Sequence, residues 1–240
     1  MSLDPLKGSK RCLVVAAHPD DEVLGVGGTI AKLSQAGTEV AILYITGGKG
    51  GRKISTEAES DAVKKEQEIL SIEIQKACSS LCVKKHERLS FPDNRLDTVS
   101  RMDISLRISE FASSFKPDVV FTHHPGDYNW DHTIAYDATL MAFRANFGDQ
   151  YPDAILSYEV LSSSERSAQN ANFIFCPNFF VDISTSIQAK KTAIGLYESE
   201  LKSYPHPRSL DGVEYLARKR GQEVGWKYAE AFQIIRLLQY

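Results

Sequence analysis

Residues 12–22 read CLVVAAHPDDE, in which an apolar run stops abruptly at a histidine, a proline and three acidic residues. A run of this length predicts a buried strand, and the His-Pro step ends it because proline disfavours a helical residue before it and cannot donate to a sheet. Open α/β sheets usually hold their functional sites beyond the carboxyl ends of their strands. Because folding alone does not require Asp20, Asp21 and Glu22 at such a position, we expect metal-assisted chemistry there.

Strand-like and helix-like segments alternate along the rest of the chain. The strand patterns cover residues 12–17, 39–46, 81–89, 119–122, 155–161, 173–176 and 179–183, and the helical patterns cover 27–35, 57–80, 102–115, 133–143, 184–201 and 212–221. This order predicts an α/β fold, a Rossmann-like three-layer sandwich with a mainly parallel sheet and the metal site at the carboxyl edge of its strands. Residues 1–10 are expected to be a disordered N-terminal segment and residues 11–240 a single domain, because no linker-like change in composition divides them.

Composition narrows the classes of function. The 240 residues carry a formal net charge of −3, so the chain lacks the basic surplus typical of nucleic-acid-binding proteins. Its apolar runs are shorter than the roughly 20 residues that a membrane span needs, and no signal-peptide core stands near the start. The four cysteines form no disulfide framework, and Cys78 and Cys82 are best explained as structural thiols. We expect a soluble cytoplasmic protein that binds no nucleic acid and has no transmembrane segment, and leave its oligomeric state open, a homo-oligomer included.

A second polar cluster follows the expected strand at 119–122. Residues 122–132 read THHPGDYNWDH and hold three of the chain's six histidines. Because parallel strands end at the same edge of a sheet, this cluster can meet His18 and the acidic residues beside it. Zinc at a catalytic site typically takes three protein ligands and leaves one position for water, so the two clusters together can complete such a site.

Each of these residues also has a purely structural explanation. A single histidine at a strand end often serves as a hydrogen-bonding group, Asp20 and Asp21 could cap the next helix, and Glu22 could stabilise its first turn. These explanations do not account for so many metal-ligating side chains at one sheet edge. The combination favours a functional metal site.

The chain resembles the LmbE-like, or PIG-L, family of zinc-dependent N-acetylglucosaminyl deacetylases. The family's Ala-His-Pro-Asp-Asp-Glu segment is matched without change at residues 17–22, and its second segment, which ends in Asp-His, is matched at 131–132. Stretches at 197–200, 205–209 and 229–232 are also similar to ones common in these proteins. The resemblance therefore spans nearly the whole chain.

The resemblance implies one zinc ion per chain, bound by His18, Asp21 and His132, with Asp20 as the general base. This division agrees with the chemistry, because neighbouring residues seldom bind one metal equally well, and the second aspartate can then face the metal-bound water. Asp131 is expected to orient a histidine or the base, since metal sites usually carry such supporting carboxylates.

One position departs from the family pattern. Many members have His-x-x-His in the second segment, and the first of these histidines helps to stabilise the negative charge that develops on the carbonyl oxygen. Asn129 stands at that position here, and its amide can donate a hydrogen bond but cannot act as a charged acid near neutral pH. The role is open to His206, His123 or His124.

Five residues are candidates for substrate binding. Arg52 lies in a glycine-rich loop after the second expected strand, where it could meet a phosphate or sugar hydroxyls, although a solvated basic loop is the alternative. Asp93 and Asn94 follow the third strand and could bond sugar hydroxyls, against a simple turn. His124 belongs to the second cluster, and Arg208 lies in a proline-flanked segment near the end of the chain.

Together these observations predict a zinc-dependent hydrolase that removes the N-acetyl group from an N-acetylated amino sugar, giving acetate and a free amine. An amidase of the same mechanism, acting on a thiol–sugar conjugate or an acylated glycopeptide, is the alternative, and a non-catalytic sugar-binding protein is a more distant one. A dinucleotide-dependent oxidoreductase is disfavoured, because residues 25–28 (GVGG) lack the G-x-G-x-x-G pattern and stand away from the strand.

Overall fold

The computed structural model describes residues 4–48, 61–146 and 151–239, and within them seven strands form one sheet in the order β3-β2-β1-β4-β5-β7-β6. The strands are β1 (Arg11–Ala16), β2 (Glu39–Thr46), β3 (Lys85–Phe91), β4 (Val119–His123), β5 (Ala154–Tyr158), β6 (Phe179–Asp182) and β7 (Ala229–Leu237). The first five strands pair in parallel, whereas β7 runs antiparallel to both β5 and β6. The mainly parallel α/β sheet expected from the sequence is confirmed.

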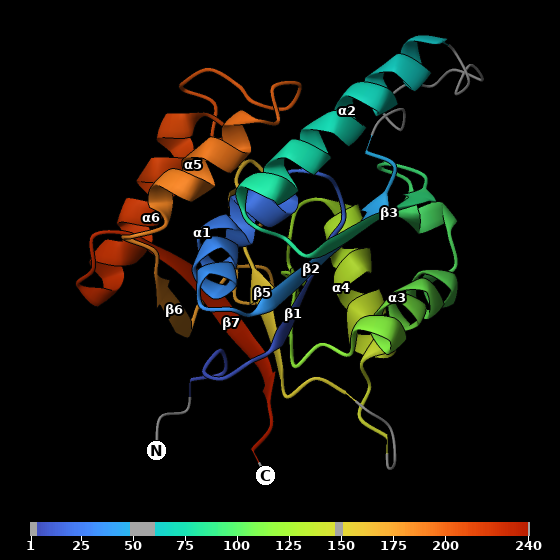
Figure 1. The fold of residues 1–240 in the computed structure, drawn as a ribbon, viewed down its shortest axis with the longest axis horizontal. Helices are drawn as coiled ribbons and strands as arrows, with labels where there is room; N and C mark the ends of the chain where they lie inside the picture. The colour runs from blue at the N-terminus through green and yellow to red at the C-terminus, as the bar shows by residue number, and fades with distance from the viewer. Residues whose placement is uncertain (1–3, 49–60, 147–150, 240) are drawn as a thin grey trace.

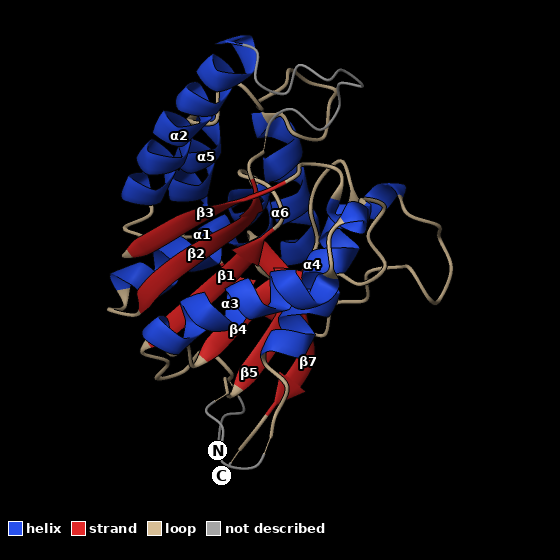
Figure 2. Cartoon of the chain, turned by 90° about the vertical axis from the view of Figure 1, so that its right-hand side faces the viewer, coloured by secondary structure: helices blue, strands red, loops and turns tan. Residues whose placement is uncertain are grey.

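Helices cover both faces of this sheet (Figure 1). In the described part of the chain they are α1 (Asp21–Gln35), α2 (Asp61–Ser80), α3 (Arg101–Phe115), α4 (Trp130–Ala142), α5 (Ile187–Gly195) and α6 (Leu210–Val224). Helices α1, α2, α5 and α6 lie on one face, and α3 and α4 lie on the other (Figures 1 and 2). None of the described helices is long and apolar enough to cross a membrane.

The alternation of side chains along β1 divides the hydrophobic core between the two faces. Val14 and Ala16 pack with α1, α2, α5 and α6, whereas Leu13 and Val15 pack with α3 and α4. All four side chains are fully buried. A central parallel strand covered on both faces is apolar throughout, as residues 12–17 are, because neither set of alternating side chains reaches water.

Two helices begin earlier than the sequence pattern indicates, and both shifts concern the polar clusters. Helix α1 begins at Asp21 rather than at residue 27, and α4 begins at Trp130 rather than at residue 133. At the second start, the side chain of Asn129 accepts a hydrogen bond from the backbone N–H of Asp131 and so caps the helix. The last residues of both polar segments, from Asp21 and from Trp130 onward, therefore belong to the first turns of helices.

Other boundaries also differ. Strand β3 begins at Lys85 rather than at residue 81, because α2 continues to Ser80 and a left-handed turn at Cys82 follows. Residues 173–176 form no strand, and the long helix expected over 184–201 is shortened to α5. Strand β7 was not expected at all. Residues 1–3 of the expected disordered start, and most of the loop that contains Arg52, lie outside the described residues.

Candidate metal centre

Three potential metal ligands meet at the carboxyl edge of the sheet. His18 follows β1, Asp21 opens α1, and His132 lies in the first turn of α4. Nδ1 of His18 lies 3.3 Å from Nε2 of His132, and Oδ2 of Asp21 lies 3.3 Å from each of these nitrogens. The three ligand atoms all lie within 4.8 Å of one another, so one ion can touch them all. The structure thus brings together the ligand set implied by the family resemblance.

The residues of this cluster fit a metal ion. Asp21 and His132 are fully buried, and Oδ1 of Asp21 has no hydrogen-bond partner among the described residues. Burial acts to raise the pKa of Asp21, but the nearby His132 and His18 outweigh it and hold this pKa well below its usual range, so the carboxylate is charged. Two imidazoles and one carboxylate are a donor set typical of catalytic zinc.

The other nitrogen of His18 is held by carboxylates. Nε2 of His18 lies 3.1 Å from Oδ2 of Asp131 and 3.4 Å from Oδ1 of Asp93. Asp131 is itself fixed, because it accepts hydrogen bonds from the backbone N–H groups of Asn94 and Leu96 at 2.7 and 3.0 Å. A carboxylate on the far nitrogen of a ligating imidazole sets its tautomer and orientation. Nδ1 of His18 is therefore the nitrogen left for a metal.

His132 has an equivalent support, which the sequence interpretation missed. Its Nδ1 lies 3.1 Å from Oδ1 of Asp127, a buried residue of the loop between β4 and α4. Asp127 also accepts hydrogen bonds from the hydroxyls of Ser163 and Ser164, and its pKa lies below its usual range because these bonds and His132 outweigh its burial. Asp127 stood within the quoted second cluster, but nothing in the local sequence connects it with serines on another loop.

Asp20 lies beside the cluster without joining it. Its backbone is left-handed, with φ 103°, a conformation that costs a residue other than glycine roughly 1–3 kcal/mol and that concentrates at functional sites. Its side chain caps no helix. Instead Oδ2 accepts a hydrogen bond from Nη1 of Arg208 at 2.9 Å, while burial, against the effect of Arg208, raises the pKa of Asp20 to about 8. A carboxyl with such a pKa can exchange protons near neutral pH.

Glu22 holds the backbone of Asp20 in place, a role that a position in the first turn of a helix does not indicate. Its Oε2 accepts the backbone N–H of Asp20 at 3.1 Å. Its Oε1 accepts the hydroxyls of Tyr44 and Tyr197 at 2.9 and 2.6 Å. All three side chains are fully buried. Burial raises the pKa of Glu22 to about 7, more than the two tyrosine bonds lower it.

Three histidines could replace the oxyanion-stabilising histidine that is absent at Asn129, and their surroundings differ. His123 is fully buried under the cluster, where its ring stacks on His132 and its Nε2 accepts the backbone N–H of Ala17. His124 is also buried, and its Nε2 lies 2.9 Å from the carbonyl oxygen of Phe173. His206 is half-buried and lines a cavity beside the cluster.

This cavity, of about 310 Å³, lies next to the metal cluster, because several of its lining residues bond to residues in or beside the cluster. Among its lining residues, Arg208 bonds Asp20, Asn94 bonds Asp131, and Ser163 bonds Asp127. The remaining lining residues are Tyr128, Asn129, Trp130, Ser162, Arg166, Glu200, Lys202 and His206. A substrate in this cavity would lie next to Asp20 and the cluster.

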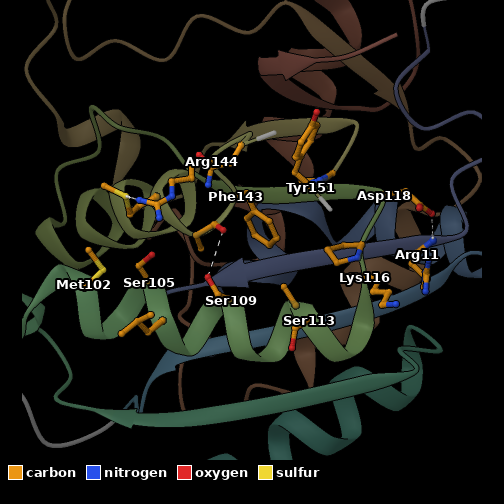
Figure 3. A pocket seen from close by; sticks show the side chains of 17 residues that line it. Arg11, Met102, Ser105, Ser109, Ser113, Lys116, Asp118, Phe143, Arg144 and Tyr151 are labelled. Carbon is orange, nitrogen blue, oxygen red and sulfur yellow. Dashed lines mark hydrogen bonds between the residues drawn. The ribbon is translucent and has the colours of Figure 1, made fainter. Parts of the chain in front are cut away.

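A larger cavity, of about 860 Å³, opens between α3 and the end of α4 (Figure 3). Ser105, Ser109 and Ser113 line it from α3, and Phe143 faces them. It also reaches Asp118, which precedes β4, whereas the metal cluster follows β4. It therefore opens at the opposite edge of the sheet and has no part in the site.

Comparison with known proteins places this site in a family. A family model described as GlcNAc-PI de-N-acetylase (PIG-L) matches residues 13–143. The chain is 26% identical to a diacetylchitobiose deacetylase of Thermococcus kodakarensis over 235 residues, which cover 97% of this chain and 85% of the relative. It thus aligns along nearly its whole length.

Comparison with solved structures agrees with the sequence comparison. The N,N′-diacetylchitobiose deacetylase of Pyrococcus horikoshii superposes with a TM-score of 0.76 at 26% identity, covering 98% of this chain and 87% of that one. The conserved protein TT1542 of Thermus thermophilus superposes with a TM-score of 0.73 at 27% identity, covering 95% of this chain and 96% of that one. Since the family model spans more than half of the chain and all three candidate ligands, this chain belongs to the PIG-L (LmbE-like) family of de-N-acetylases.

Proposed function

We propose that this chain is a zinc-dependent N-deacetylase that hydrolyses the N-acetyl group of an amino sugar, giving acetate and a free amine. The observation that carries the proposal is a buried carboxylate, Asp20, held beside a His-Asp-His cluster without joining it. A site that only bound a metal would need no such group. Two proteins similar to nearly the whole chain are named diacetylchitobiose deacetylases, which supports an acetylated amino sugar as substrate.

We assign one zinc ion per chain to His18, Asp21 and His132. Magnesium and calcium prefer all-oxygen sites, so two imidazole ligands favour a transition metal. The bound metal would supply a Lewis acid that polarises the amide carbonyl and lowers the pKa of a water molecule. Asp131 and Asp127 would keep the two histidines in the orientation that this binding requires.

Asp20 is proposed as the general base. It would take a proton from the water whose oxygen attacks the amide carbon, and return that proton to the amide nitrogen as the C–N bond breaks. A pKa raised by burial to about 8 suits both steps, since a group that takes and gives a proton works best with a pKa near the ambient pH. Arg208 would hold the carboxylate in its position.

Asn129 stands where many family members have a histidine that helps to stabilise the negative charge on the carbonyl oxygen. His206 is our candidate for that role in this chain. Its Nδ1 accepts the backbone N–H of Arg208 at 3.1 Å, so the neutral ring carries its proton on Nε2. Burial and the positive charges of Arg166, Arg208 and Lys202 lower the pKa of His206, which favours this neutral form. A neutral imidazole can donate a hydrogen bond to the carbonyl oxygen as negative charge develops there.

We retain Asp93, Asn94 and Arg208 as candidate contacts of the sugar, since all three lie at or beside the cavity. Arg52 lies outside the described residues and stays a prediction. A cytoplasmic location is also proposed, because all four cysteines are free thiols, as is usual in reducing compartments.

The first experiment measures amine release from N-acetylglucosamine, diacetylchitobiose, N-acetylglucosaminyl inositol and a thiol–sugar amide, with and without a chelator and with zinc restored. Asp20→Asn should retain zinc and lose about 10²–10⁴-fold in kcat, whereas His132→Ala should lose zinc as well. Wild-type turnover in Asp20→Asn would refute the assignment of the base. Release from a thiol–sugar amide alone would favour the amidase alternative, and sugar binding without release would favour a non-catalytic protein.

A further inference from the structure

The cavity beside the metal cluster is lined by an unusual concentration of positive charge. Arg166, Lys202 and Arg208 line it together with His206, and Glu200 is the one acidic residue among the described lining residues. These basic residues come from two loops, one between β5 and β6 and one between α5 and α6. The chain as a whole has a formal net charge of −3, so this local surplus opposes its overall charge.

Two of these basic groups are free to meet a ligand. Arg208 is engaged by Asp20 and by the hydroxyl of Ser162. The side chains of Arg166 and Lys202 are exposed and form no ion pair or hydrogen bond with any described residue. The exposed side chain of Arg101, by comparison, is paired with Asp137. Two unpaired positive charges therefore line the cavity beside the metal cluster.

The loop that carries Arg166 is fixed against the metal centre. Arg166 ends a short turn whose Ser163 and Ser164 donate to the buried carboxylate of Asp127, and Asp127 lies against His132. The backbone that carries Arg166 is therefore positioned relative to the cluster by buried hydrogen bonds. A segment that is already ordered costs less to order on binding than a mobile one.

The cavity also presents two aromatic rings. Tyr128 and Trp130 line it and remain 66% and 58% exposed. Nε1 of Trp130 donates to the carbonyl oxygen of Asn94 at 3.1 Å, which holds the indole in one orientation. Exposed, oriented rings beside polar groups are typical of binding sites rather than of ordinary surface.

We propose that this cavity binds an anionic group, a carboxylate or a phosphate, on the aglycone of the acetylated sugar, and that Arg166 and Lys202 make the contacts. The inference rests on the proposed N-deacetylase function and adds to it the class of substrate. The sugar ring would lie at Asp20 and the metal cluster, and the aglycone would extend past Tyr128 and Trp130 toward the two cations. Arginine suits this role because its planar donors match both carboxylate and phosphate.

The test compares three N-acetylglucosamine substrates that differ only in the aglycone: the methyl glycoside, a glycoside with a carboxylate on the aglycone, and the 1-phosphate. The readout is the ratio of kcat/KM for each anionic substrate to that for the methyl glycoside, for the wild type, Arg166→Gln, Lys202→Gln and the double variant. Lys84→Gln is the matched control. Lys84 is exposed and precedes the amino-terminal end of β3, whereas the metal cluster lies at the carboxyl ends of the parallel strands.

For the wild type we expect a ratio of about ten or more at low salt, lowered about two- to fivefold by each single variant and about tenfold by the double variant, chiefly through KM. Lys84→Gln should leave the ratio unchanged. The ratio should also fall as salt rises, since the Debye length shortens from about 10 Å at 0.1 M to about 3 Å at 1 M. A preference for one anionic substrate alone identifies carboxylate or phosphate as the group bound.

A ratio near one in the wild type, or one that the double variant leaves unchanged, overturns the inference while the N-deacetylase function stands. If no substrate releases amine, the N-deacetylase proposal fails, and calorimetric titration with the free-amine forms of the anionic glycosides decides the inference separately. Binding to the wild type that weakens about tenfold in the double variant supports the cavity as an anion site. Equal binding to both proteins contradicts it.

Discussion

Removing the hydroxyl of Tyr197 tests whether the buried network around Glu22 positions the proposed base. The hydroxyl donates to Oε1 of Glu22 at 2.6 Å, and Oε2 of the same carboxylate accepts the backbone N–H of Asp20. Tyr197→Phe leaves Tyr44 as the remaining hydroxyl donor to Oε1. The loss of one buried hydrogen bond to a carboxylate costs about 2 kcal/mol, which in a domain of this size lowers Tm by roughly 4–8 °C.

We also expect an effect on catalysis, because Asp20 holds a left-handed backbone conformation that its neighbours must maintain. Tyr197→Phe should lower kcat about tenfold and change KM by less than about twofold, since the lost contact lies behind the base and not at the cavity. The assays are amine release and thermal unfolding, with Tyr215→Phe as the control because Tyr215 is 59% exposed. Wild-type kcat in Tyr197→Phe, whatever its Tm, would refute the positioning role of Glu22.

Three further changes test the metal centre and the core. Asp127→Asn should weaken zinc binding about 10–100-fold, measured by competition with a chelator, and unchanged affinity would mean that His132 needs no carboxylate support. When the metal is normally present at 100 times its Kd, chelation should lower Tm by an amount equivalent to about 2.7 kcal/mol. Zinc but not magnesium should restore Tm, and recovery with magnesium would contradict the ligand assignment. Lys190→Met should cost about 3 kcal/mol in urea unfolding, because it leaves Glu230 buried without its cation. An unchanged midpoint would show that the backbone N–H groups of Gly28 and Thr29 satisfy this carboxylate by themselves.

The sequence predicted the parts of the molecule that depend on short-range patterns. The apolar run before His18 and the run over 119–122 are buried parallel strands, and their polar ends meet at one sheet edge because parallel strands must end together. The starts of α1 and α4 were placed too late, since periodicity was sought in apolar residues and these first turns are acidic. An acidic first turn is favoured by the helix dipole, and here it also carries the ligand Asp21.

Contacts between distant parts of the chain could not be predicted in this way. Arg208 reaches Asp20 across 188 positions, and Tyr197 reaches Glu22 across 175. Strand β7 was missed for a related reason: its residues are ordinary for a strand, but its antiparallel place between β5 and β6 depends on how the chain returns to the sheet. The residues that hold the site in place were therefore harder to predict from the sequence than the candidate ligands and the proposed base.

The family model includes the candidate ligands and the proposed base but not the residues proposed to bind the aglycone. The family model ends at residue 143, so it includes the candidate ligands, Asp20 and Asp127, whereas Arg166, Lys202 and the rest of the basic loops lie beyond it. The candidate ligands and the proposed base come from strand ends and first turns of helices, whereas His206 and Arg208 come from the loop between α5 and α6. The proposed contacts of the aglycone come from loops, which can change without disturbing the sheet. Changing the charges of Arg166 and Lys202 should therefore alter which acetylated sugars are used, while the site that breaks the amide bond stays as it is.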